Sequence, residues 1–164
     1  MVSESREKYL IKNTFIFTIG SIATKLITFV LVPIYTHILT TQEYGVVDLI
    51  STISMVLAPV IILNISESVM RFSLDKEADH HQIMSSGLMI LIIGVLGGLL
   101  IIPITKCFVS LGEYSLFLYF YTISSATSQL LLCYLRGKEQ LIQYTCGNII
   151  NTFSVAVLNI LFFC

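Results

Sequence analysis

The chain has 164 residues, of which 55% are hydrophobic and only 12% are charged, and its formal net charge is −1. Soluble domains carry about 25% charged residues, so this composition and a mean hydropathy of +0.88 exclude an ordinary soluble domain. The near-zero net charge gives no indication of nucleic-acid binding, and we expect none.

Several stretches without a charged residue are long enough to cross a bilayer, because about 20 apolar residues span the hydrocarbon core. Each should be helical, since every backbone polar group in lipid must be satisfied within its own segment. We therefore predict an all-α transmembrane bundle behind a polar lead-in at residues 1–12, with the whole of 13–164 as the membrane domain. The five predicted spans lie near residues 13–39, 45–70, 83–105, 114–135 and 141–164.

The basic residues indicate how these spans are oriented. Seven of the nine lie before the first span or in the second and fourth connections: Arg6, Lys8, Lys12, Arg71, Lys76, Arg136 and Lys138. Cytoplasmic loops carry an excess of lysine and arginine. The pattern thus predicts a cytoplasmic N-terminus, with the fifth span running outward.

Lys25 is the strongest functional signal in the first span. An isolated charge at the centre of a membrane helix costs roughly 2.5–3.5 kcal/mol on insertion scales. Lys25 also follows Thr14, Thr18 and Ser21 at helical spacings, which places it on a polar stripe. One interpretation is a cation that faces an aqueous cavity and attracts an anionic substrate. The alternative is a lysine that snorkels to the interface or pairs with an acid on another helix.

Further candidate substrate contacts lie in the second, fourth and fifth spans. Asn64, Glu67 and Arg71 follow one another at helical spacings in the last turns of the second span, which places them on one helical face. Glu67 precedes Arg71 by four, the favourable order for an intrahelical ion pair, and this pair has either a substrate role or a structural role at the interface. Gln129, Asn148 and Asn151 line a cavity or form hydrogen bonds between helices. The third span carries Gly94 and Gly98 in a small-xxx-small pattern typical of close helix packing.

The sequence contains no nucleotide-binding or hydrolase motif, so we predict neither an enzyme nor a cofactor. Asp79, His80 and His81 are adjacent in a polar segment that is predicted to be a solvated loop. Neighbouring histidines of this kind are weak evidence for a metal site, and no metal is predicted.

The first sixty residues of the membrane domain resemble the start of bacterial polysaccharide flippases, the Wzx-like translocases of the multidrug/oligosaccharidyl-lipid/polysaccharide exporter superfamily. The resemblance rests on an ordered set of residues: Asn13, Lys25–Leu26, Phe29–Val30–Leu31–Val32–Pro33, Tyr44–Gly45 and Arg71–Phe72. It is a pattern of spaced residues in apolar helices, and the later spans agree with it in length and topology.

This resemblance implies a two-lobed transporter of the bacterial inner membrane, in which alternating access moves a lipid-linked anionic oligosaccharide outward for surface polysaccharide such as O-antigen or lipopolysaccharide. It implies that Lys25, and also Arg71, meet the sugar or its pyrophosphate. Five spans make most of one lobe, so we expect a fragment that depends on a second lobe or on polysaccharide-assembly proteins as well as on membrane lipid.

Two other functions stay open on the sequence alone. A drug or metabolite antiporter of the same superfamily would need an intramembrane carboxylate, and only Asp48 and Glu67 come near that requirement. A scaffold or remnant that transports nothing is the other alternative, and it fits the small number of spans.

Overall fold

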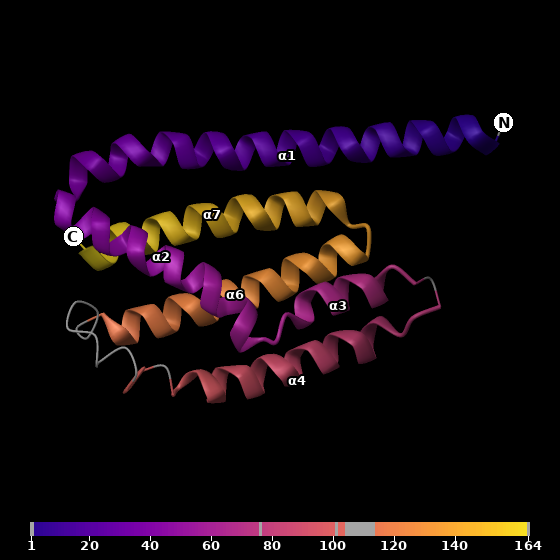
Figure 1. Ribbon diagram of the computed structural model, residues 1–164. Coiled ribbons are helices and arrows are strands. Elements are labelled where there is room, and N and C mark those ends of the chain that lie inside the picture. The colour runs from indigo at the N-terminus through magenta and orange to yellow at the C-terminus, as the bar shows by residue number, and fades with distance from the viewer. Residues whose placement is uncertain (1, 76, 101, 104–113, 164) are drawn as a thin grey trace. The chain divides into compact units, whose positions relative to one another are not determined.

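The computed structural model describes residues 2–75, 77–100, 102–103 and 114–163, and helix is the regular structure found there. Five of its helices are long and apolar enough to cross a membrane, as predicted. The described helices are α1 (Val2–Ile38), α2 (Thr41–Ile61), α3 (Ile65–Ser73), α4 (His80–Gly98), α6 (Ser115–Gly137) and α7 (Leu141–Phe163) (Figure 1).

The chain divides into two compact units. The first combines Met1–Gly45 with Glu139–Cys164, so α1 and α7 meet although they lie at opposite ends of the sequence. The second is the continuous segment Val46–Lys138, which holds α3, α4, α6 and most of α2.

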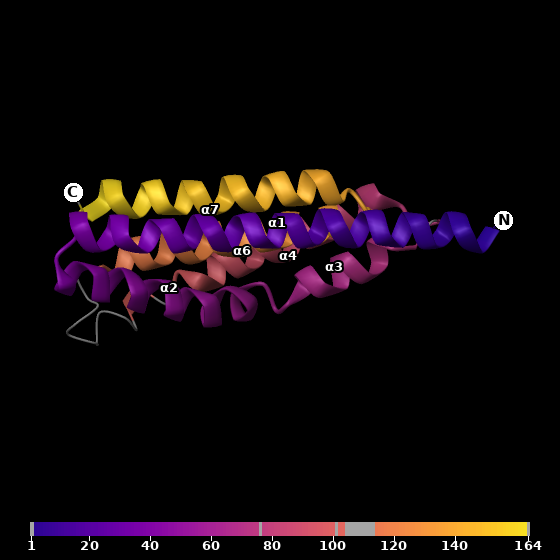
Figure 2. The ribbon, with the colours of Figure 1, turned by 90° about the horizontal axis from the view of Figure 1, so that it is seen from above.

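In the first unit, α1 and α7 lie side by side and run in the same direction (Figures 1 and 2). Helix α1 begins at Val2, so the polar lead-in is helical and continuous with the first span. The helix also continues through Pro33, whose missing backbone N–H is tolerated near the end of a membrane helix. The contact is close where Gly20 meets Thr145, because a Cβ on Gly20 would overlap the Thr145 methyl group.

The predicted second span, near 45–70, is wrong as a single helix. It is interrupted after Ile61, where Leu63 and Asn64 adopt φ angles of 48° and 53°. The Asn64 N–H bonds the Pro59 carbonyl at 2.7 Å and the Leu63 N–H bonds the Val60 carbonyl at 3.1 Å. This pair of bonds is a Schellman closure, which normally has glycine at the left-handed position. Leu63 occupies that position here, so the sequence gave no warning of the break.

The core of the second unit surrounds this break. Helix α3 packs on α6 and α4, and apolar side chains from all four helices form one cluster: Ala58, Ile61, Ile62, Val69, Leu91, Ala126 and Leu130. Helices α2, α3 and α6 run in the same direction, and α4 runs opposite to them (Figure 1).

Glycines on α4 and α6 allow the closest contacts of this core. The Ile61 carbonyl sits against Gly94, and Gly98 faces Ile61 and Tyr119. The predicted packing role of Gly94 and Gly98 is therefore confirmed, whereas a Cβ on the neighbouring Gly97 would meet nothing within 4 Å.

The polar segment before α4 is shorter than predicted, because His80 and His81 belong to the helix. Asp79 is the N-cap residue, and its carboxylate accepts the His81 N–H at 2.9 Å and the Gln82 N–H at 3.4 Å. A capped start satisfies orphan donors of the first turn, which explains why the helix begins three residues before the apolar run. The predicted third span also extends past the end of α4, and residues 101 and 104–105 lie outside the described residues.

Candidate functional site on the α1 and α7 pair

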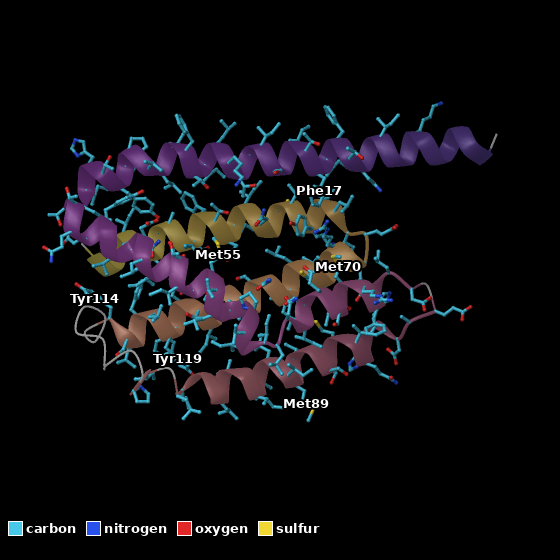
Figure 3. All side chains as sticks on the ribbon, viewed as in Figure 1. Phe17, Met55, Met70, Met89, Tyr114 and Tyr119 are labelled. Carbon is cyan, nitrogen blue, oxygen red and sulfur yellow. The ribbon has the colours of Figure 1, made fainter. Side chains whose placement is uncertain are left out.

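Two contacts fix how α1 and α7 face each other. Gly20 packs on Thr145, and the rings of Phe17 and Tyr144 stack at 5.4 Å between centroids and 7° between planes. Figure 3 shows Phe17 between the two helices. Further along, Asn159, only 4% exposed, lies beside Tyr35. The residue pairs advance together along both helices, which sets a parallel register.

This register brings three predicted residues to one side of the pair. Ser21 and Lys25 follow Phe17 at i+4 and i+8, and Asn148 and Asn151 follow Tyr144 at i+4 and i+7, so these positions share the flank of the stacked rings. We call this surface the polar flank, and its members are Ser21, Lys25, Tyr144, Asn148 and Asn151.

Lys25 and the two asparagines also lie at the same height. Lys25 is five residues beyond Gly20, or about 7.5 Å along the axis at 1.5 Å per residue. The same advance from Thr145 reaches residue 150, which falls between Asn148 and Asn151. Lys25 is exposed, whereas the two asparagines are half-buried.

The threonines beside the flank satisfy their own hydroxyl groups. Thr18 donates to the Thr14 carbonyl at 2.8 Å, and Thr28 donates to the Thr24 carbonyl at 3.0 Å. On α7 the Thr152 hydroxyl donates to the Asn148 carbonyl at 2.9 Å. These protons are used within the helix, so among the described side chains of the flank the three-proton ammonium group of Lys25 is the strongest donor.

The other four predicted residues belong to the second unit. Glu67 and Arg71 are exposed on the short helix α3, and Asn64 is the N-cap residue at the break. Gln129 is half-buried on α6, one position before the core residue Leu130. Glu67 and Arg71 keep their predicted spacing of one helical turn on α3, whereas Asn64 lies outside the helix, at the break, so the prediction of one continuous helix is wrong at Asn64. The Glu67–Arg71 ion pair stays a prediction.

Sequence reasoning missed two contacts, one between buried hydroxyl groups and one between aromatic rings. Ser54 on α2 and Thr122 on α6 are fully buried, and their hydroxyl groups lie 3.0 Å apart. Thr122 already donates to the Leu118 carbonyl at 2.7 Å, so Ser54 is the donor between them. The stacking of Phe17 on Tyr144 is the other, and the only sequence signal for it was the position of Tyr144 four residues before Asn148.

Among the described residues, no three histidine, cysteine, aspartate or glutamate side chains come together as a metal site would require. Asp79 serves as a helix cap. The rings of His80 and Tyr134 pack nearly perpendicular to each other, with 6.4 Å between their centroids. The Lys138 amine lies 5.2 Å from the centre of the same Tyr134 ring. These contacts give the most polar segment of the second unit a structural explanation.

Comparison with known families decides where this helical membrane protein belongs. Residues 10–164 match the family described as polysaccharide biosynthesis protein. The chain belongs to that family. The match covers all five apolar helices and includes every residue of the polar flank, so membership agrees with the resemblance drawn from Lys25, Pro33 and Tyr44–Gly45. The chain matches no curated protein sequence and no solved structure.

Proposed function

We propose that this polysaccharide biosynthesis protein takes part in moving a lipid-linked anionic oligosaccharide across the bacterial inner membrane, as a transporter and not as an enzyme. The observation that carries the proposal is the polar flank, where one exposed lysine stands level with two amides on a membrane helix pair. A cation held in low dielectric attracts phosphate strongly, and amides hydrogen-bond sugar hydroxyl groups. Family membership and five apolar helices support the same function.

In this proposal the flank forms one wall of a translocation cavity. Arg71, Glu67, Asn64 and Gln129 are proposed as further contacts from the second unit. Orientation follows the basic residues, with the N-terminal end of α1 in the cytoplasm.

The test replaces Lys25 and measures surface polysaccharide made by cells that depend on the protein. Lys25→Ala removes the charge and should lower export at least tenfold, whereas Lys25→Arg keeps the charge and should retain most of it. Lys138→Ala is the matched control, because it removes a lysine that packs on Tyr134 in the other unit. Normal export by Lys25→Ala, at wild-type protein level in the membrane fraction, would refute the proposed role of the flank.

A further inference from the structure

The break between α2 and α3 holds two consecutive non-glycine residues in the left-handed region. That region is disfavoured roughly five- to thirty-fold per residue for L side chains. The Leu63 side chain is 79% exposed, so its own burial does not offset this strain. What holds the conformation is the Schellman pair of hydrogen bonds together with the close seat of the Ile61 carbonyl against Gly94.

The helix segments on the two sides of the break are held very differently. On the C-terminal side of the break, α3 packs closely on glycines of its neighbours. On α6, a Cβ added to Gly137 would lie 2.6 Å from the Ser73 Cβ and 2.7 Å from the Met70 carbonyl oxygen of α3. A Cβ on Gly87 would lie 3.0 Å from the Val69 side chain. These distances show that α3 lies in close contact with both α4 and α6.

On the N-terminal side of the break, α2 buries Val47, Ile50, Ser54, Ala58 and Ile61, and a buried hydrogen bond from Ser54 to Thr122 joins it to α6. Its backbone nevertheless approaches the other helices at fewer points than that of α3 does. Met55, Val56 and Val60 on the same helix are each at least 62% exposed. One such hydrogen bond between membrane helices is weak, because the separated partners find other partners. The second unit therefore combines a closely packed segment, α3, with a less closely packed one, α2, across a strained junction.

We propose that residues 62–64 form a hinge on which α2 moves against α4 and α6 while α3 stays in place. The conformation described here is the bent state, which Ser54 and Thr122 latch. In the other state Leu63 and Asn64 relax toward right-handed backbone, and the Ile61 carbonyl leaves Gly94. The use of this motion, to open and close a translocation cavity, rests on the proposed function, but the motion itself is a property of the second unit.

The motion is measured by spin-label distances in the full chain, reconstituted in lipid with its four cysteines replaced by alanine. One pair joins α2 to α6 (Val56→Cys with Leu131→Cys), and the control pair joins α3 to α6 (Phe72→Cys with Leu131→Cys). All three positions are exposed, which makes them suitable for labelling. The α2 pair should give two distance populations and the α3 pair one narrow population. A single narrow population for both pairs would overturn the hinge.

Substitutions at Leu63 test whether the strain sets the balance. Glycine adopts positive φ without penalty and is unfavourable in a straight helix, so Leu63→Gly should raise the ratio of bent to relaxed population at least fivefold over Leu63→Ala. Alanine is the matched control, because it removes the same side chain but keeps the Cβ. Equal ratios in the two variants would overturn a hinge at this residue.

Spin-label distances and polysaccharide export, measured together, distinguish a failure of the hinge from a failure of the proposed function. Two populations for α2, together with normal export by Lys25→Ala, would refute the substrate role and leave the hinge standing. A fixed α2, together with export lost in Lys25→Ala, would refute the hinge and leave the proposed function standing.

Discussion

The two units differ in whether their polar side chains are buried or exposed. In the second unit Ser54 and Thr122 face each other across α2 and α6 and are fully buried in a hydrogen bond. In the first unit Ser21 and Lys25 lie to one side of the α1 and α7 contact and are exposed. The difference comes from neighbours: four helices enclose a core in one unit, whereas a pair of helices always leaves two flanks uncovered. Polar residues are enclosed in the packing in the first case and are exposed in the second.

The largest expected effect is in the second unit, at Gly94. In Gly94→Ala the new Cβ would overlap the Ile61 carbonyl oxygen, and backbone there cannot move without disturbing the break. Overpacking of this kind costs about 1–3 kcal/mol. Thermal unfolding of the purified protein in detergent should show a clear loss of stability.

Gly97→Ala, in the same helix, is the control for that substitution. A Cβ there meets nothing within 4 Å, so the variant should be neutral or gain about 0.5–1 kcal/mol from the better helix former. Equal unfolding temperatures for the two alanine variants would contradict the close contact between Gly94 of α4 and the Ile61 carbonyl of α2.

A smaller effect is expected in the first unit, at Gly20. A Cβ there would overlap the Thr145 side chain rather than backbone, and a side chain can rotate away. Gly20→Ala should therefore destabilise the protein by about 1 kcal/mol, the low end of the overpacking range. Adding Thr145→Ala should restore most of the loss, whereas additive losses in the double variant would contradict direct contact between the two positions. The measurement is again thermal unfolding in detergent.

The smallest effect is expected at the buried hydroxyl pair. Ser54→Ala removes the donor and should lower stability by about 0.6 kcal/mol, the average for a hydrogen bond between membrane helices. Thr122→Ser keeps both hydroxyl groups and should preserve the bond, although it loses a buried methyl group. A double-mutant cycle between Ser54→Ala and Thr122→Val measures the pair directly. A coupling energy near zero would show that this bond does not hold α2 to α6.

Sequence reasoning succeeded where one physical constraint acts on a whole segment. The bilayer demands long apolar helices with satisfied backbones, so the positions of α6 and α7 follow from charge-free runs, and that of α1 follows from an apolar run in which Lys25 is the one charged residue. The helical spacing of Thr14, Thr18, Ser21 and Lys25 likewise predicted a polar stripe, and all four side chains are exposed on α1. The spacing of Gly94 and Gly98 predicted a packing face in the same way.

Sequence reasoning failed where the conformation is decided by contacts. Residues 45–70 read as one apolar helix, because Leu63 carries no local signal for a left-handed turn. Asp79 looked like part of a loop until its carboxylate was seen to cap α4. In both places backbone N–H groups bond acceptors two to five residues away.

The sequence by itself determined that this protein is a helical membrane protein with a lysine on a polar stripe, because hydropathy and helical periodicity are properties of each segment alone. Only the tertiary structure decided that Lys25 stands level with Asn148 and Asn151, since that depends on the parallel register set by Gly20 on Thr145 and Phe17 on Tyr144. It also decided that the second span breaks at Leu63, where the close fit of Ile61 on Gly94 helps hold a backbone conformation that leucine does not favour.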